Sequence, residues 1–118
     1  MKSVQICLVS ATIYICTILS SSAQSFSQKQ QNAMNHVAQV LAAIAFCPEF
    51  ESNDAIIVLL GMHYNFTISD EKTKAIIVAK AREHKAGLEK VGKTAGCLAA
   101  WALYGPGGQN VPDLIRRK

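Results

Sequence analysis

The segment that decides the fold is GKTAGCLAAWALYGPGG, residues 92–108, a helical run with glycines at 92 and 96 and a cysteine at 97. A glycine inside a helix costs about 1 kcal/mol relative to alanine. Gly92, Gly96 and Ala100 recur every four residues, so they form a ridge without large side chains. A disulfide needs alpha carbons about 5 to 6 Å apart, closer than ordinary helix packing brings most pairs. The ridge beside Cys97 therefore predicts that the backbone of the first or second helix approaches closely around a disulfide.

Cys47 is the predicted partner of Cys97. The chain has four cysteines, and Cys7 and Cys16 belong to a segment that we expect to be removed on export. An even pair that remains in an exported chain is typical of a disulfide. Closing a loop of about 50 residues stabilises a domain by about 4 kcal/mol in the chain-entropy account. The alternatives are two reactive thiols, which lack a C-x-x-C spacing, and a haem site at Cys47, which lacks C-x-x-C-H.

The first 23 residues, MKSVQICLVSATIYICTILSSSA, have the parts of a signal peptide. Lys2 supplies a positive charge, an apolar run follows, and small residues stand at Ser21 and Ala23. The alternative is an uncleaved anchor, but the apolar run is about 16 residues, whereas about 20 are needed to span a bilayer. We therefore predict a signal peptide over residues 1–23, cleaved after Ala23, and a single helical domain over residues 24–118.

Apolar periodicity predicts two helices in the first half of this domain. The first begins near Gln28 and ends at Cys47, because a residue before proline avoids helical angles. Its core stripe consists of Met34, Val37, Leu41 and Ile44. The second helix follows Asn53 and reads AIIVLLGMHY, which is apolar nearly all round, so we expect it to be the central buried helix. A buried strand is the alternative for IIVLL, but no second strand-like run is present to pair with it.

The second half predicts a long amphipathic helix from Ser69 to about Val91. Whether the helix continues through Gly92 or breaks there stays open. Further along, Trp101 and Tyr104 lie on the side of Cys97 and are expected to cover the disulfide. The segment GPGG ends the helix, and Leu114 and Ile115 then dock on the core. The expected fold class is all-α, a small helical bundle of about four helices with one disulfide.

A basic face is predicted on the long helix and just beyond it. The formal net charge of the whole chain is only +4. Basic residues nevertheless cluster on the side of the long helix opposite its apolar arc, which consists of Ile77, Ala81, His84, Leu88 and Val91. The members of this possible interaction face are Lys74, Arg82, Lys85 and Lys93. A merely solvated face is the alternative. If the face binds, an acidic envelope or extracellular protein is the expected partner, since export and the absence of interleaved aromatic residues argue against nucleic acid.

Catalytic and metal-binding patterns are weak in this sequence. His36, His63 and His84 fall on three predicted helices without i, i+3 or i+4 spacing, which does not favour metal binding. The acidic residues of the turn over 49–54 are expected where negative charge favours a helix N-terminus. Because no nucleophile motif occurs either, we expect no catalytic activity and no cofactor. The alternative is a small secreted enzyme, or a metal- or haem-binding protein that uses His63 and His84 or the 49–54 acidic turn.

The expected function is that of a small exported binding protein. In size, helical content and cysteine count, the predicted domain is similar to small periplasmic acid-stress chaperones and to periplasmic immunity or inhibitor proteins. The signal peptide predicts an exported protein, periplasmic or secreted. The similarity, which is one of size and cysteine count, implies an inhibitor, immunity or chaperone-like role, but no binding residue carries over. Membrane contact is expected only through the signal peptide before cleavage. Asn65-Phe66-Thr67 is a glycosylation sequon, which would matter in a eukaryotic secretory pathway.

Overall fold

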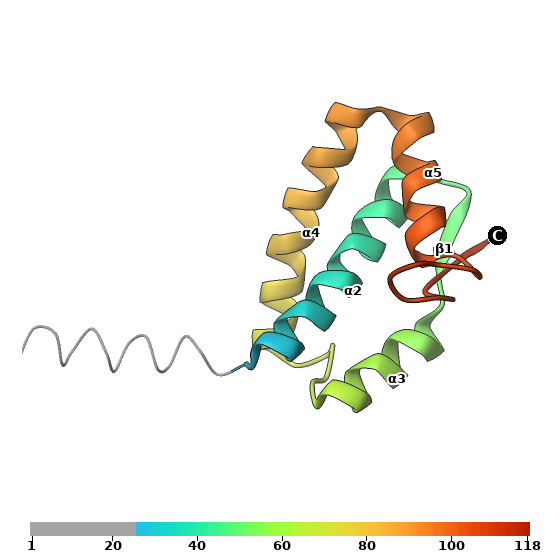
Figure 1. Ribbon diagram of the computed structural model, residues 1–118. Helices are drawn as coiled ribbons and strands as arrows, with labels where there is room; N and C mark the ends of the chain where they lie inside the picture. The colour runs from blue at the N-terminus through green and yellow to red at the C-terminus, as the bar shows by residue number, and fades with distance from the viewer. Residues whose placement is uncertain (1–25) are drawn as a thin grey trace, which may run out of the picture.

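The computed structural model describes residues 26–118, so the predicted signal peptide over residues 1–23 lies outside the described residues. This part of the chain contains four helices, arranged as Figure 1 shows, and the predicted all-α bundle with one disulfide is confirmed. The helices are α2 (Gln28–Phe46), α3 (Asp54–Tyr64), α4 (Glu71–Val91) and α5 (Lys93–Tyr104). Two short strands, β1 (Phe50–Ser52) and β2 (Ile115–Arg117), complete the fold.

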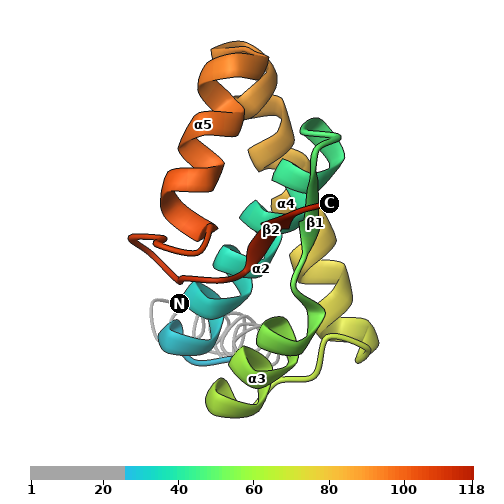
Figure 2. The ribbon, with the colours of Figure 1, turned by 90° about the vertical axis from the view of Figure 1, so that its right-hand side faces the viewer.

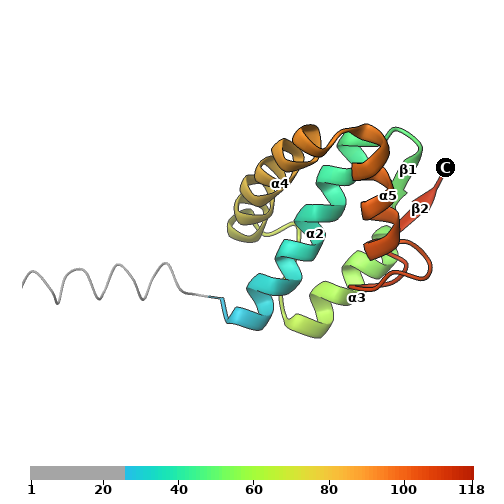
Figure 3. The ribbon, with the colours of Figure 1, turned by 45° about the horizontal axis from the view of Figure 1, so that its top comes forward.

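Helix α2 is the central element. It starts with a capping box, in which the Ser27 hydroxyl accepts from the Gln30 amide and the Gln30 side chain accepts from the Ser27 amide. It ends as predicted, because Cys47 takes an extended conformation before Pro48. Figures 1 and 3 show α2 between α4 on one side and α3 and α5 on the other, and α2 contacts all three helices and β1.

The prediction that AIIVLLGMHY forms the central buried helix is wrong. The segment is helical, but only Ile57 and Gly61 of α3 are buried, whereas Val58, Leu59 and Met62 are 56 to 69% exposed. The physical reason lies in α2, where four buried alanines allow neighbouring helices to approach on several sides. The short helix α3 therefore packs on α2 with one edge and leaves apolar side chains uncovered.

Gly92 breaks the chain between α4 and α5, so the two helices are separate. Its φ of 99° lies in the region that favours glycine, and a side-chain carbon placed on Gly92 would have nothing within 4 Å. Gly92 is therefore a turn residue and not part of a packing ridge. Because the chain changes direction, the apolar arc of α4 does not continue into α5, and Val91 and Leu98 are 63 and 65% exposed.

Gly96 provides the close approach that the sequence predicted. A side-chain carbon there would lie 3.1 Å from Leu88 Cδ2 and 3.3 Å from Phe46 Cε2, so α5 packs on the ends of both α2 and α4. The adjacent residue Cys97 forms the disulfide with Cys47, and their alpha carbons are 5.9 Å apart. The nearest groups are side chains at the ends of α2 and α4, so the predicted close approach of a backbone from the first or second helix is wrong in this respect.

Gly96→Leu is expected to lower the free energy of unfolding by about 1 to 3 kcal/mol, because the new side chain overpacks the junction with Leu88 and Phe46. Gly87→Leu is the matched control. Gly87 lies within α4 with nothing within 4 Å of the new carbon, so the gain in helix propensity should leave stability unchanged or raise it by up to about 1 kcal/mol. Urea unfolding followed by circular dichroism measures both. A Gly96→Leu variant as stable as the control would contradict close packing.

A two-stranded β-ribbon joins the segment after α2 to the segment after α5, and the sequence patterns did not predict it. Strands β1 and β2 pair antiparallel, with Phe50 opposite Arg117, and Figure 2 shows them side by side near the C-terminus. Leu114 and Ile115 are fully buried, which confirms their predicted docking on the core. The ribbon also places Phe50 against Trp101, with ring centroids 5.4 Å apart. This stacked pair connects β1 to α5.

Candidate functional site: an apolar groove

An apolar groove lies where α2, α3 and α4 meet. It is an open cavity of about 530 Å³. Each helix contributes apolar side chains to its wall: Val37 and Leu41 from α2, Ile57, Val58 and Met62 from α3, and Ile77 and Val78 from α4. The loop between α3 and α4 closes one end, and the charged groups that reach the cavity are Asp54 and Lys74. We call this surface the apolar groove.

More than half of the exposed large hydrophobic residues in the described part of the chain line the apolar groove. Seven large hydrophobic residues are exposed among residues 26–118, and four of them line the groove: Leu41, Val58, Met62 and Val78. Leu41 belonged to the predicted core stripe, but it is 37% exposed. Contiguous exposed apolar surface in a small protein is typical of a binding surface. Met62, the most exposed of the four at 69%, has a flexible side chain that adapts to different partners.

Local backbone geometry keeps the groove open. Asn65 ends α3 in the left-handed conformation, at φ 60°, so the chain turns sharply into the loop before α4. The Phe66 amide then donates to the Gly61 carbonyl at 2.9 Å, and a side-chain carbon on Gly61 would lie only 2.7 Å from the Phe66 carbonyl oxygen. The loop is thus held against the buried edge of α3. It lines the groove beside Val58 and Met62, which stay 56 and 69% exposed.

Three of the four predicted basic-face residues lie on α4 beside the groove. Lys74, Arg82 and Lys85 are all exposed, and within residues 26–118 the one salt bridge joins Arg116 to Glu51. By helical periodicity Lys74 and Lys85 lie on the same side of α4, and Arg82 lies about one-sixth of a turn from Lys85. We call these three residues the basic row. It starts at Lys74, in the wall of the groove.

Lys93 does not extend this row. It begins α5 after the turn at Gly92, and its ammonium group lies 5.6 Å from the centre of the Phe46 ring, within the range of a cation–π interaction. The predicted four-residue basic face is therefore divided between two helices.

The three histidines do not form one cluster. His36 and His63 line a polar cavity of about 860 Å³ between α2 and α3. His84 lies in a different cavity, and its Nε2 is 2.7 Å from the Asn35 side-chain oxygen. Burial lowers the pKa of His84 below its usual value; Lys80 adds to this effect and Glu83 opposes it. His63 and His84, the pair that the alternative function would use, are therefore placed in separate surroundings.

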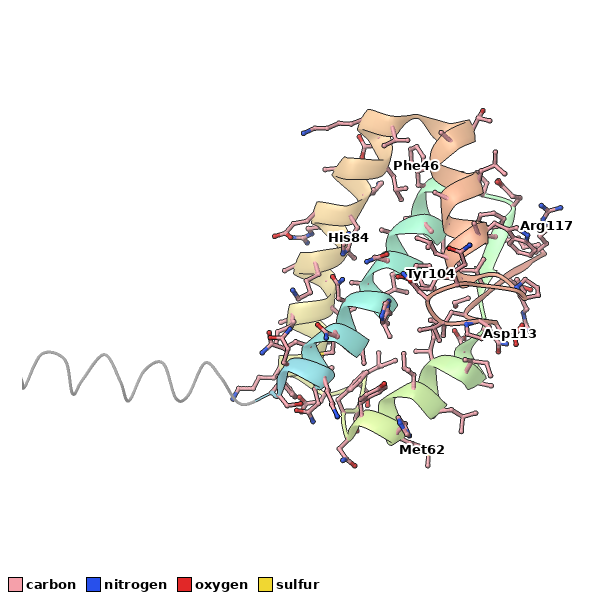
Figure 4. The ribbon with its side chains drawn as sticks, in the orientation of Figure 1. Phe46, Met62, His84, Tyr104, Asp113 and Arg117 are labelled. Carbon is pink, nitrogen blue, oxygen red and sulfur yellow. A yellow bond between two sulfur atoms is a disulfide. The ribbon has the colours of Figure 1, made fainter. Side chains whose placement is uncertain are left out.

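His36 belongs to a hydrogen-bond network around Tyr104. The Tyr104 hydroxyl donates to the Gln39 oxygen at 2.6 Å, and His36 Nδ1 lies 2.9 Å from the same hydroxyl. Because a hydroxyl has a single proton, His36 Nδ1 is the donor in the second bond, and Nε2 of the neutral ring is the unprotonated nitrogen. Figure 4 shows Tyr104 between α2 and α5. Tyr104 thus joins α5 to α2 through Gln39 and His36. This differs from the role predicted for it, which was to cover the disulfide.

Acidification is expected to destabilise the fold through His36. Burial lowers the pKa of His36, so the unfolded chain binds a proton near pH 6.5 and the folded chain binds it only at lower pH. Its contribution to stability is present above about pH 6.5 and is lost as the pH falls through the folded-state value. His36→Gln should therefore flatten the dependence of unfolding free energy on pH between about 7 and 5. His63→Gln, from the same cavity, is the control, and an equal pH dependence of wild type and His36→Gln would contradict the assignment.

The acidic turn over 49–54 is distributed among separate contacts. Glu51 pairs with Arg116 at 3.2 Å, and Asp54 accepts from the Ser52 hydroxyl at 2.6 Å. In the described part of the chain, the one group of three possible metal ligands within 4.8 Å of one another is Cys47, Glu49 and Cys97. Both cysteine sulfurs of this group form the disulfide, so they offer no thiolate to a metal.

Fold and surface together define a class, a small disulfide-bonded helical bundle with an apolar groove. Family models, curated proteins and solved structures were all compared with the chain, and none matches it. Among residues 26–118, none of the helices combines the length and apolar character that crossing a membrane requires.

The apolar groove is the feature that sequence reasoning missed. Periodicity could not identify an exposed side in the run AIIVLLGMHY, so it predicted burial for the whole segment. The length and composition of this helix could have indicated the groove. An 11-residue helix that is apolar all round has more apolar surface than one neighbouring helix can cover, so part of that surface is expected to stay exposed.

Proposed function

We propose that the protein is an exported, periplasmic binding protein of inhibitor, immunity or chaperone-like type, which acts on another envelope or extracellular protein without catalysis. The observation that carries this proposal is the apolar groove, where three helices expose Leu41, Val58, Met62 and Val78 around one cavity. A groove of this kind binds the apolar side of a partner segment.

Two features support export. The first is the predicted signal peptide over residues 1–23, with its charged start, its apolar run and its small residues at Ser21 and Ala23. The second is the disulfide between Cys47 and Cys97, which is compatible with an oxidising location.

Binding is favoured over catalysis by the character of the groove itself. The two ionisable side chains in its wall, Asp54 and Lys74, come from different helices, and Asp54 already accepts from Ser52. Most of the remaining surface consists of aliphatic side chains and Met62, which bind through apolar burial. Stable recognition through such a surface depends on apolar contact and on shape complementarity with the partner. The groove provides the apolar contact surface.

Met62→Lys is expected to reduce capture of the partner at least tenfold, because it places a charge among the apolar contacts of the interface. The experiment immobilises the wild-type chain and the variant, passes envelope extract over both, and compares the retained proteins quantitatively. Leu98→Lys is the matched control, since Leu98 is 65% exposed on α5 outside the groove. Equal retention by wild type and Met62→Lys, or an equal loss in Leu98→Lys, would contradict binding in the groove.

A further inference from the structure

We infer that the groove takes an amphipathic helix from another protein, one that carries acidic side chains along the edge facing α4. This inference rests on the proposed function and specifies its partner. It combines the apolar wall of the groove with the basic row that begins at its rim.

The occupant is helical because the groove provides few partners for a free backbone. The walls come from α2, α3 and α4, whose own backbone groups are used within the helices. The polar side chains at the edge are few, chiefly Asp54, Thr67, Ser69 and Lys74. An extended segment would bury unpaired amides and carbonyls in the apolar part of the groove, at a cost in free energy for each group. A helix satisfies its backbone internally and can present apolar side chains at i, i+4 and i+7.

The acidic side chains that we infer for the bound helix are complementary to the charges of α4. This helix contains six basic and three acidic residues. Lys74 lines the groove, and Arg82 and Lys85 continue along the helix without a salt bridge in the part of the chain that the structure describes. Of the three acidic residues, Glu71 and Glu89 lie on this side of α4 at the two ends of the row, and Glu83 lies on the opposite side. A bound helix along α4 would therefore meet positive charge over its central part, which favours Glu or Asp at these positions.

A second copy of the chain fits this surface less well. The outer edge of α3, where Figure 4 shows Met62 away from α5, is the apolar helix edge that a copy could offer. Within α3 the one acidic residue is Asp54, at the N-terminus. The α3 edge of a second copy would therefore bring little negative charge to the basic row, so it lacks the charge complementarity expected of the occupant.

The test uses two synthetic helical peptides of about 18 residues, both with leucine at i, i+4 and i+7. One carries glutamate along one edge, and the other carries lysine at the same positions. Their dissociation constants for the whole chain, purified with its disulfide intact, are measured by fluorescence anisotropy at about 50 and 500 mM salt. We expect the acidic peptide to bind at least tenfold more tightly at low salt. The preference should shrink at high salt.

Three variants assign the binding to the groove and the basic row. Met62→Lys should weaken the acidic peptide at least tenfold. Arg82→Glu combined with Lys85→Glu should remove the preference for the acidic peptide, whereas Lys90→Glu, on a different side of α4, should leave it within about twofold.

The possible outcomes separate the partner class from the proposed function. Groove-dependent binding of both peptides with equal affinity would overturn the acidic-edge inference and leave the binding groove intact. Failure of both peptides, while Met62→Lys still loses the natural partner, would overturn the helical occupant alone. Dimerisation of the chain in sedimentation, lost in Met62→Lys, would show that a second copy occupies the groove and overturn the inference.

Discussion

Replacing Cys47 and Cys97 together by serine is expected to lower the free energy of unfolding by about 4 kcal/mol. The disulfide closes a loop with a sequence separation of 50 residues, so its removal restores much conformational freedom to the unfolded chain. For a domain of this size the loss corresponds to a fall in melting temperature of about 15 to 30 °C. Thermal unfolding followed by circular dichroism measures it.

Reduction of the wild-type protein is the control for the serine substitutions. Both treatments open the same loop, so the two losses should agree within about 1 kcal/mol. A double-serine variant that unfolds at the wild-type temperature would show that helix packing alone holds α2 to α5, and would contradict the stabilising role assigned to the disulfide.

Tyr104→Ala is expected to cost about 3 to 5 kcal/mol, the second large effect. Tyr104 is 1% exposed and is the largest of the fully buried side chains. Its removal leaves a cavity between α2 and α5 and also removes the hydrogen-bond partner of His36 and Gln39. Urea unfolding of the variant measures the sum of both losses.

Tyr104→Phe separates the hydroxyl from the ring. This variant keeps the packing and removes only the hydrogen bonds, so the expected loss is about 1 to 3 kcal/mol. His36 and Gln39 then lack their partner in a half-buried site. A Phe variant as stable as the wild type, together with a large loss in the Ala variant, would assign the stabilisation to packing alone.

Helix ends were predictable from the sequence because their signals are local. Pro48 restricts Cys47 and ends α2, and the acidic start after Ser69 gives α4 its N-cap at Asp70, whose carboxylate accepts from the Thr73 amide at 3.3 Å. The pairing of Cys47 with Cys97 was predictable because only two cysteines follow the predicted signal peptide. These predictions needed no knowledge of how the helices are arranged.

The choice of the central helix was not predictable from hydrophobicity. The segment AIIVLLGMHY is more apolar than α2, yet α2 occupies the centre, with Met34 and Val40 fully buried. Small residues in α2 permit close contact with neighbouring helices on several sides. Which helices these are depends on the three-dimensional arrangement, and the sequence pattern does not specify it. The exposure of Val58 and Met62 follows from that arrangement.

The remaining features depend on residues far apart in the sequence. Tyr104 bonds to a side chain 65 residues away, and Phe50 pairs with Arg117 across the β-ribbon. Strands of three residues are too short to give a period, so no pattern predicted the ribbon. The apolar groove likewise depends on residues far apart in the sequence, since Leu41, Met62 and Val78 come from three separate helices.

The most direct test of the binding groove is to titrate the captured partner into isotope-labelled protein and record the backbone amide chemical shifts. We expect the largest changes at Leu41, Val58, Met62 and Val78, with Leu98 and Trp101 on α5 unchanged. Changes concentrated on α5 or on the β-ribbon, with the groove residues unaffected, would contradict the assignment of the groove as the binding site.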